Sequence, residues 1–206
     1  NGGCIANIYL GTHKGAPHAI AVSANFWAVG FTNGAIYLYN RSSFYSRLRD
    51  YGFNTNYLHY SWGMSFNNAG NKLLVADYYK NRLIELNVSS GAKLSHSQVS
   101  SGTSMYGTGS YSTSNGYFRR PMDAAYDSSG NIYALDLYGH RLQKFNSSLT
   151  YQAQVGGYST SSGFRYPYGM HIDSSDNIYV TDFYNYAVRK YNTSLTETAT
   201  YGGGAG

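Results

Sequence analysis

The chain has 206 residues with a formal net charge of +5, and only 12% of its residues are charged. Glutamate occurs twice and good helix formers are scarce, which excludes collagen, coiled coils and long helical bundles. Leu, Ile, Val and Phe make up only 39 residues, but 24 tyrosines supplement them, and the net charge is too low for a disordered chain. No apolar run approaches 18 residues, so we expect no membrane span. The composition predicts a soluble, turn-rich all-β protein.

The N-terminal segment begins at Asn1 and not at Met. We therefore expect a processed product or an excerpt without its signal peptide, and an extracellular or cell-surface location. Cys4 is the single cysteine, which excludes an internal disulfide and leaves an inert thiol or an intermolecular bridge. Residues 4–11 are similar to the last strand of the repeats that follow and are predicted to form one extra strand.

Four copies of one repeat make up most of the remaining sequence. They lie at about 17–52, 60–102, 121–157 and 167–203. The last two are near-copies, because residues 121–150 and 167–196 align without gaps at a period of 46. Each copy divides into four short segments with the composition of β-strands, separated by turn signals. Four strands in each repeat of some 40 residues predict the blades of a β-propeller.

The copies also resemble the NHL repeat. The resemblance is carried by the patterns Gly-Phe-x-x-Pro-x-Gly, Asp-x-x-Gly-Asn-Ile-Tyr-Val-x-Asp and Arg-Leu-Gln-Lys-Phe. It is strong at 118–157 and 163–203, clear at 60–90 and faint at 17–52. It implies a β-propeller. Together with the four copies and the segment 4–11, it predicts one domain over 1–206 with four four-stranded antiparallel blades and one extra N-terminal strand. It implies no single activity, since this fold hosts binding, scaffold and enzyme roles.

The extra strand leaves three ways to complete the structure. It adds to the last blade as a closing clasp, or the chain is an arc of a larger propeller, or the strand pairs with the edge of a neighbouring copy. We favour a self-contained unit of four blades.

Three aspartates end the second strand of a copy: Asp77, Asp136 and Asp182. We interpret them as structural, because an Asp there accepts backbone N–H bonds and pairs with a basic residue such as Arg82 or Arg141. The turns at 127–131 and 173–177 lack the acidic ligand series of a calcium loop. We therefore expect no metal.

Catalytic patterns are missing from the sequence. The six histidines have no metalloprotease spacing, and neither a Gly-x-Ser-x-Gly motif, a Cys-His pair nor a phosphate loop occurs. Some propeller lyases similar to the NHL family use His, Tyr and Arg around a metal, but those residues match here in type alone. We expect no enzyme activity and no cofactor, with a metal-dependent lyase as the least favoured reading.

Four Asn-x-Ser/Thr sequons occupy the same repeat position, the turn after the third strand. Their asparagines are Asn40, Asn87, Asn146 and Asn192. In a secreted chain these are candidate N-glycosylation sites. The alternative is duplication of a good turn sequence, since Asn and Ser are turn formers.

The loops that lead into the blades combine arginine with aromatic residues. The candidates for a binding face are Arg119, Arg120, Arg165, Tyr166, Tyr168 and Trp62. Such a face suits glycans, proteins or RNA, although the modest net charge argues against nucleic acid. The long loop 100–117 adds Tyr106 and Tyr111 as candidates for a specific contact.

These features predict a secreted, non-enzymatic structural or interaction module. Its partners would be other copies of the chain or cell-surface molecules. One version is a subunit that self-assembles through its N-terminal strand and Cys4 into a surface layer or appendage. The alternative is a propeller receptor for a glycan, a protein or RNA that uses the arginine and aromatic face.

Overall fold

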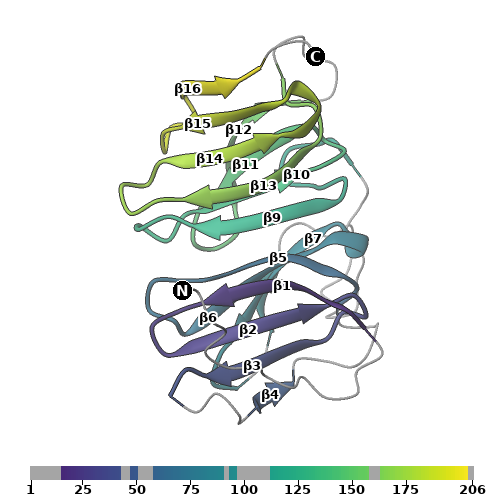
Figure 1. Cartoon of the computed structure of the whole chain (residues 1–206), viewed down its shortest axis with the longest axis vertical. Helices are drawn as coiled ribbons and strands as arrows, with labels where there is room; N and C mark the ends of the chain where they lie inside the picture. Colours follow the sequence, from purple (N-terminus) through teal and green to yellow (C-terminus); the bar gives the residue numbers. More distant parts are fainter. Residues whose placement is uncertain are drawn as a thin grey trace, which may run out of the picture.

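The computed structural model describes residues 15–42, 47–50, 58–90, 93–96, 112–157 and 163–203. Within these residues the fold is all-β, with four antiparallel sheets of four strands each (Figure 1). The predicted strand 4–11, Cys4 and most of the long loop, including Tyr106 and Tyr111, lie outside the described residues.

Each sheet is a meander in which strands adjacent in sequence are also adjacent in the sheet. Sheet 1 contains β1 (Pro17–Val22), β2 (Phe26–Phe31), β3 (Ile36–Asn40) and β4 (Arg47–Asp50). Sheet 2 contains β5 (Ser61–Phe66), β6 (Lys72–Asp77), β7 (Arg82–Asn87) and β8 (Lys93–His96). Sheet 3 contains β9 (Pro121–Tyr126), β10 (Ile132–Asp136), β11 (Arg141–Phe145) and β12 (Tyr151–Gly156). Sheet 4 contains β13 (Pro167–Ile172), β14 (Ile178–Asp182), β15 (Ala187–Tyr191) and β16 (Glu197–Gly202).

Two single-turn 3-10 helices interrupt this pattern, η1 (Tyr78–Lys80) and η2 (Phe183–Asn185), each between the second and third strands of a sheet. No helix in the described ranges is long and apolar enough to cross a membrane.

The turns between first and second strands form because their side chains bind the local backbone. Asp127 Oδ1 accepts hydrogen bonds from the N–H groups of Ser129 (3.0 Å) and Asn131 (2.8 Å). Gly130 has φ of +82°, in the left-handed region that glycine adopts without strain. The Asp127 carboxylate is therefore used to close the turn, as its Asp-x-x-Gly-Asn sequence indicates.

The sheets pack through the alternation of side chains along each strand. On β10, Ile132 and Ala134 face sheet 2, whereas Tyr133 and Leu135 face sheet 4. All four side chains are fully buried. A central sheet therefore needs a neighbour on both faces, and tyrosine supplies part of the apolar surface that the aliphatic residues lack.

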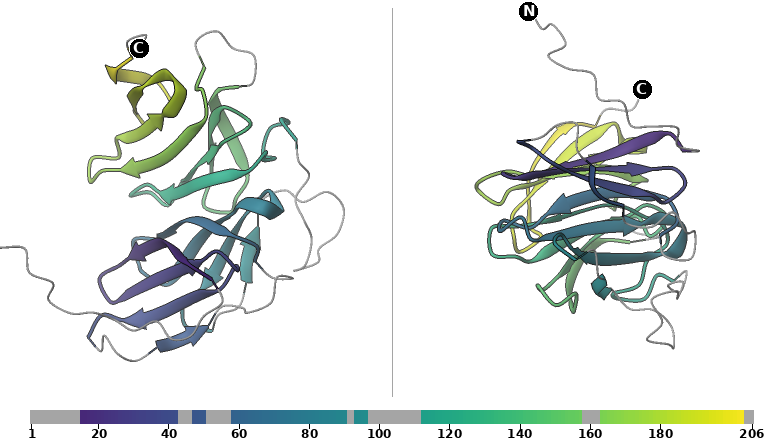
Figure 2. Two further views of the ribbon diagram at one scale, coloured as in Figure 1. Left: turned by 45° about the vertical axis from the view of Figure 1, so that its right-hand side comes forward. Right: turned by 90° about the horizontal axis from the view of Figure 1, so that it is seen from below.

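The four sheets form an open arc. Their first strands pack in series, β1 on β5, β5 on β9 and β9 on β13 (Figure 1). Sheets 1 and 4 lie at the two ends of this series, as a second view shows (Figure 2). On sheet 4, Val188 and Tyr201 are 36% and 55% exposed, whereas Leu142, which aligns with Val188 in sheet 3, is 0% exposed. Within the described residues the arc is open between sheets 1 and 4, and the self-contained unit of four blades that we favoured stays a prediction.

Candidate binding face

In sheets 2, 3 and 4, the loop that leads into the first strand hydrogen-bonds to the loop that follows the second strand. The bonds run from backbone N–H to carbonyl oxygen: Tyr78 to Tyr60 (3.1 Å), Leu137 to Arg120 (3.0 Å) and Phe183 to Tyr166 (3.4 Å). The three accepting residues have φ between 56° and 71°, in the left-handed region. The two loops of each sheet consequently lie together, on the side of the molecule where first strands begin and second strands end.

A buried aspartate holds each pair of loops in place. Asp136 Oδ1 accepts the backbone N–H of Arg119 (2.7 Å), and Oδ2 accepts Nε of Arg141 (2.9 Å). The same geometry joins Asp77 to His59 and Arg82, and Asp182 to Arg165 and Arg189. The predicted pairing with arginine is confirmed, and the bond to the leading loop is an addition that the sequence did not indicate.

Keeping these three aspartates ionised costs free energy, because their buried carboxylates are not hydrated by water. Burial raises the pKa of Asp136 to about 6, although the guanidinium group of Arg141 acts in the opposite direction. Burial likewise raises the pKa of Asp77. A carboxylate in such a place is stable only with its partner, so these residues are scaffold and not reactive groups.

Aromatic side chains lie together on the side of the molecule that carries these loops. We call this surface the aromatic face, and define it by His18, Tyr60, Trp62, Tyr78, Tyr79, Tyr138, His140, Tyr166, Tyr168, Phe183 and Tyr184. Four of them are large side chains exposed by 41% to 58%, namely Tyr79, Tyr168, Phe183 and Tyr184. Exposed aromatic residues that lie together mark an interaction surface more often than scattered ones do.

One half of the aromatic face belongs to sheets 1 and 2. The Tyr60 and Trp62 rings stack with centroids 5.0 Å apart, and His18 lies 4.9 Å from Tyr60. Tyr78 packs on Trp62 at 5.5 Å. Burial raises the pKa of Tyr78 to about 12, and its hydrogen bond with Tyr138 of sheet 3 adds to the effect. Tyr78 therefore stays neutral and connects the two halves of the face.

The other half belongs to sheets 3 and 4. The ring of Tyr166 contacts His140 at 4.6 Å, Tyr138 at 5.7 Å and Tyr184 at 5.2 Å. His140 Nδ1 accepts the backbone N–H of Tyr166, and burial lowers the pKa of His140, so the imidazole is neutral. Tyr168 contacts Trp62 across the arc at 6.0 Å, which makes the aromatic face continuous.

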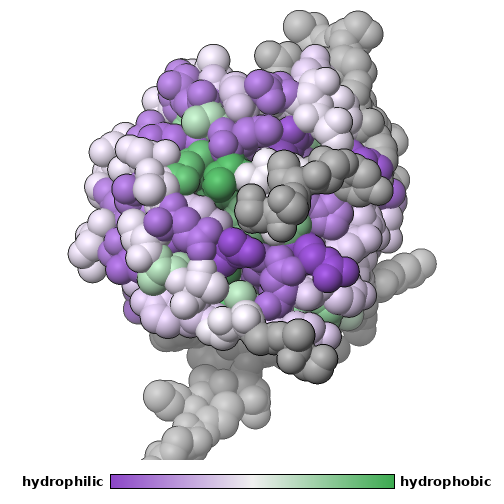
Figure 3. Space-filling view, turned by 90° about the horizontal axis from the view of Figure 1, so that it is seen from above, coloured by the Kyte–Doolittle hydropathy of each residue, from purple (hydrophilic) through white to green (hydrophobic). Residues whose placement is uncertain are grey.

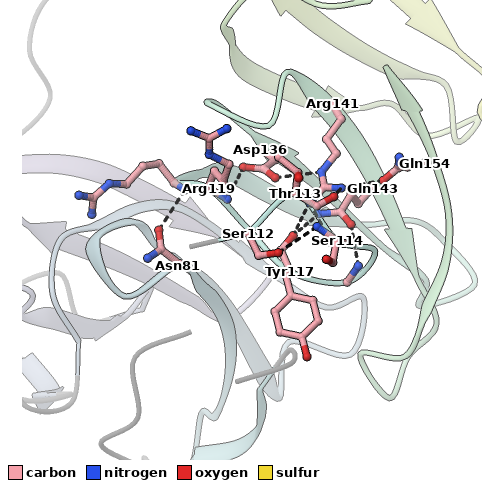
Figure 4. A network of polar contacts seen from close by, with 12 residues as sticks. Asn81, Ser112, Thr113, Ser114, Tyr117, Arg119, Asp136, Arg141, Gln143 and Gln154 are labelled. Carbon is pink, nitrogen blue, oxygen red and sulfur yellow. Dashed lines mark hydrogen bonds and ion pairs between the residues drawn. The ribbon is translucent and has the colours of Figure 1, made fainter. Parts of the chain in front are cut away.

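The three predicted arginines have different surroundings. Arg120 lies over the rings of Tyr78 (5.1 Å) and Tyr79 (4.6 Å), a cation–π arrangement. Arg165 is exposed beside Tyr166. Arg119 contributes its backbone N–H to Asp136 (Figure 4). Of the predicted residues, the structure brings together Trp62, Arg120, Tyr166 and Tyr168 on one surface.

The described end of the long loop, residues 112–117, is tied to sheet 3 by Arg141 and Gln143 (Figure 4). The guanidinium group of Arg141 donates to the carbonyl oxygens of Thr113 (2.6 Å) and Tyr117 (2.7 Å). Gln143 donates to Tyr117 and accepts from the N–H of Gly116. Because Arg141 also binds Asp136, the ion pair and the loop form one network.

The sequon asparagines close the turns after the third strands. Asn146 Oδ1 accepts the N–H groups of Ser148 (3.0 Å) and Thr150 (2.9 Å), and Asn192 Oδ1 does the same with Ser194 and Thr196. Asn40 and Asn87 bind the N–H groups of the serines two residues on. The turn role is present at all four positions, and glycosylation stays a prediction.

A cleft of about 490 Å³ opens between the first strands of the four sheets. Its lining includes Trp62 and Tyr168 of the aromatic face, with Asp123, Met170 and His171. Among the described residues, His, Cys, Asp and Glu nowhere form a group of three that could hold a metal ion.

Sequence reasoning missed Tyr138, His140 and Tyr184. They follow second strands, and only the hydrogen bonds between the two loops of each sheet bring them to the leading loops. Tyr138 and Tyr184 recur at one repeat position, two residues after Asp136 and Asp182, and this recurrence is the signal that could have identified them. His140 has no such signal, because Tyr186 occupies its position in the last repeat.

Comparison with known proteins finds similarity in fold alone. No protein-family model and no curated protein sequence matches the chain. A crystal structure of a protein of unknown function from Bacteroides caccae is 12% identical, with a TM-score of 0.60 over 91% of this chain and 61% of that one. A chain of a nidogen/laminin complex is 14% identical, with a TM-score of 0.67 over 90% of this chain and 63% of that one. The structure of U3-55K is 10% identical, with a TM-score of 0.70 over 92% of this chain and 52% of that one.

These similarities and the four meander sheets define the fold as of the β-propeller type. The chain spans between about half and just under two thirds of the length of the three structures.

Proposed function

We propose that the chain is an extracellular, non-enzymatic interaction module that binds a protein segment through its aromatic face. The observation that carries this proposal is the continuous set of aromatic rings beside a cleft, four of them exposed. Tyr and Trp offer a large contact area with a polar tip and lose little conformational entropy on binding, which is why they are common in protein interfaces. The nidogen/laminin complex offers a precedent for a chain of similar fold in a protein complex.

A nucleic-acid partner fits this face less well. Arg120 already stacks on Tyr78 and Tyr79, so its guanidinium plane is occupied from one side. The net charge of +5 is spread over a chain in which only 12% of residues are charged. Nucleic-acid binding draws most of its affinity from phosphate contacts with many basic residues.

We further propose that the four sheets are NHL-type blades and an arc of a larger ring. The repeat patterns quoted above support the first part of this proposal. The exposed outer face of sheet 4 and the greater length of the similar structures support the second.

The binding proposal can be tested with a phage-displayed library of random 12-residue peptides. Selection on the wild-type chain is expected to enrich related peptides that bind the aromatic face. The triple variant Trp62→Ser, Tyr168→Ser, Tyr184→Ser is expected to lose these peptides. The control is Tyr201→Ser, which removes an equally exposed tyrosine from sheet 4 outside the aromatic face.

Peptides that bind the triple variant as well as the wild type would contradict the proposal. Parallel assays with a glycan array and with single-stranded homopolymeric RNA cover the alternatives. Binding in one of these, without peptide enrichment, would replace a protein partner by a sugar or RNA. An intact mass that exceeds the sequence mass by sugar residues would establish that sequons are glycosylated.

A second candidate function, self-assembly, is favoured by the outer face of sheet 4. There Tyr179 and Lys190 stand where sheet 3 presents Tyr133 and Lys144, both of which bind Thr193 of the next sheet. Figure 3 views the molecule from above Figure 1 and shows a hydrophobic patch among hydrophilic residues on that side. As the alternative to further blades of a larger ring, a second copy of the chain would cover this face, packed face to face through Val188 and Tyr201.

Sedimentation velocity tests this candidate. The wild-type chain is expected to dimerise with increasing concentration, and Val188→Asp is expected to prevent it. Val22→Asp is the control, since Val22 is 58% exposed on β1 at the other end of the arc. A wild-type chain that stays monomeric at every concentration would exclude self-assembly through this face.

A further inference from the structure

Asp123 occupies an unusual place in the cleft between the first strands. The third residue of β5 is Gly63 and the third residue of β13 is Gly169, whereas the third residue of β9 is Asp123. The third repeat therefore places a carboxylate where two other repeats have no side chain. That carboxylate belongs to the lining of the cleft.

The Asp123 carboxylate has no positive partner among the residues that the structure describes. Its Oδ1 accepts the N–H of Ala124 (2.9 Å), and Oδ2 accepts the N–H of Met170 on β13 (2.9 Å). The ion pairs of the described residues all involve other acids. Each carboxylate oxygen has a second lone pair, so two backbone bonds leave acceptor capacity unused.

The surroundings of Asp123 differ from those of the three aspartates that anchor the loops. Asp77, Asp136 and Asp182 each bind the Nε atom of an arginine on the third strand of their own sheet. Asp123 lies at the edge of a cleft of about 490 Å³ and is half-buried, so a ligand can reach it. A partly buried negative charge without a counter-ion favours a cationic ligand.

Aromatic and sulfur-containing side chains complete the lining. Trp62 and Tyr168 line the cleft, and so do Met64, Met122 and Met170. Aromatic rings attract cations through their negative faces, and methionine side chains adapt to an alkyl chain. The cleft thus combines a carboxylate with a lining suited to an alkyl stem that ends in a positive charge.

We propose that this cleft binds a primary ammonium group on an alkyl chain, the chemistry of a lysine side chain, with Asp123 as its counter-ion and Trp62 and Tyr168 around its stem. The proposal rests on the proposed function, in which the lysine belongs to the bound protein segment. Burial raises the pKa of Asp123 to about 6, so the group is ionised at pH 7 and above, where an ammonium ion would offset its desolvation.

The test uses Nα-acetyl-lysine-N-methylamide as the probe and Trp62 fluorescence as the readout. The Trp27→Phe background removes the only other tryptophan, which is buried against Tyr39. The measurement is made at pH 8, well above the pKa of Asp123, so that the carboxylate is ionised. We expect saturable binding, weakened about tenfold or more by Asp123→Asn, since a charge-assisted bond is lost.

The same probe acetylated on its ε-nitrogen is the matched control on the unchanged protein. It keeps the alkyl stem and loses the charge, so it is informative even if Asp123→Asn does not fold. Equal binding of both probes, or no binding of the charged probe, would overturn the proposal. Calcium alone binding at the same concentrations and competing with the probe would instead assign the cleft to metal ions.

The results of the probe and peptide experiments distinguish failure of the ammonium site from failure of the proposed function. Selected peptides without lysine, combined with no probe binding, would reject the ammonium site and leave the aromatic face as a binding surface. Probe binding without any peptide enrichment would keep the site and reject the protein partner.

Discussion

The hydroxyl group of Tyr133 in sheet 3 donates a 3.1 Å hydrogen bond to the backbone carbonyl oxygen of Thr193 in sheet 4. Lys144 Nζ donates to the same oxygen at 2.7 Å. The carbonyl oxygen of Thr193, in a turn of sheet 4, thereby accepts hydrogen bonds from two side chains of sheet 3. Adjacent sheets are joined by specific polar bonds in addition to their apolar cores.

Tyr133→Phe is expected to lower the free energy of unfolding by about 1 kcal/mol, the usual net value of one hydrogen bond. Tyr179→Phe is the matched control, because Tyr179 aligns with Tyr133 but lies on the last sheet. Both hydroxyl groups bond an aspartate of their own sheet, Tyr133 to Asp127 (3.2 Å) and Tyr179 to Asp173 (3.3 Å). Within the described residues only Tyr133 of the two also bonds the next sheet, so the loss of the Tyr179 hydroxyl is expected to cost less. Urea unfolding followed by circular dichroism measures both; equal effects would contradict a role for the bond between sheets.

Asp136→Asn is expected to destabilise the protein by about 3 kcal/mol, since it leaves the buried guanidinium group of Arg141 without its counter-ion. Asp182→Asn is expected to cost less, because its partner Arg189 is 17% exposed and also binds Glu197. The comparison requires denaturant unfolding of both variants. A larger loss for Asp182→Asn would show that exposure of the arginine does not control the cost.

Gly63→Ala is expected to destabilise the fold by about 3 kcal/mol or to prevent folding, as overpacking of close backbones does. A Cβ atom at Gly63 would lie 2.3 Å from Oδ1 and 2.5 Å from Cα of Asp123. Gly169→Ala is the control, because its Cβ would meet only Thr181 Oγ1, at 3.5 Å. Thermal melting of both variants is sufficient, and similar melting temperatures would refute the close approach of β5 and β9.

The stability of the chain is expected to depend on Asp123 between about pH 4 and pH 6. Burial raises the pKa of Asp123 to about 6 in the folded chain, whereas an unfolded aspartate titrates near 3.9. The folded state therefore binds the proton more tightly, so ionisation of Asp123 costs stability above pH 6 and costs nothing below pH 4.

The measurement is the difference in unfolding free energy between the wild type and Asp123→Asn. On acidification from pH 7.5 to pH 4.5 the wild type is expected to gain about 1 kcal/mol relative to the variant, after allowance for the partial exposure of the group. A difference that is constant over this range would mean that the carboxylate titrates normally.

Ser148→Ala and Asn146→Ala separate the turn role from the glycosylation signal. Ser148→Ala removes the sequon but keeps the N–H that binds Asn146 Oδ1, so stability is expected to be unchanged. Asn146→Ala removes the acceptor of two backbone bonds and is expected to cost about 1 kcal/mol. Unfolding of unglycosylated protein measures both. Equal stability would leave glycosylation as the only use of the asparagine.

The sequence was sufficient for those parts of the fold that repeat. Asp77–Arg82 and Asp136–Arg141 share a spacing of five residues, and their pairing could be predicted because both ends of the contact lie on adjacent strands. In the last copy Ala187 stands where Arg141 is expected, and Asp182 pairs with Arg189 instead. The aromatic face could be predicted only in part. Trp62 and Tyr168 lie on first strands, but Tyr138 and Tyr184 join them through bonds between loops that no local pattern encodes.

The open arc and the site around Asp123 could not be predicted for a different reason. Whether sheet 4 has a neighbour depends on long-range packing, and Val188 is as apolar as the covered Leu142. Asp123 stands where two other repeats have glycine. Only the structure shows that its carboxylate lines a cleft and has no basic partner among the described residues.

The even number of strands in each sheet has a consequence for how such a molecule can change in size. Because four antiparallel strands are an even number, the chain enters and leaves every repeat on the same side of the molecule. Adding or deleting a whole repeat therefore moves no loop of the other repeats to the opposite side. The aromatic loops remain on one side and the asparagine turns on the opposite side. The two sides can therefore diverge independently, while duplication alone sets the length of the arc.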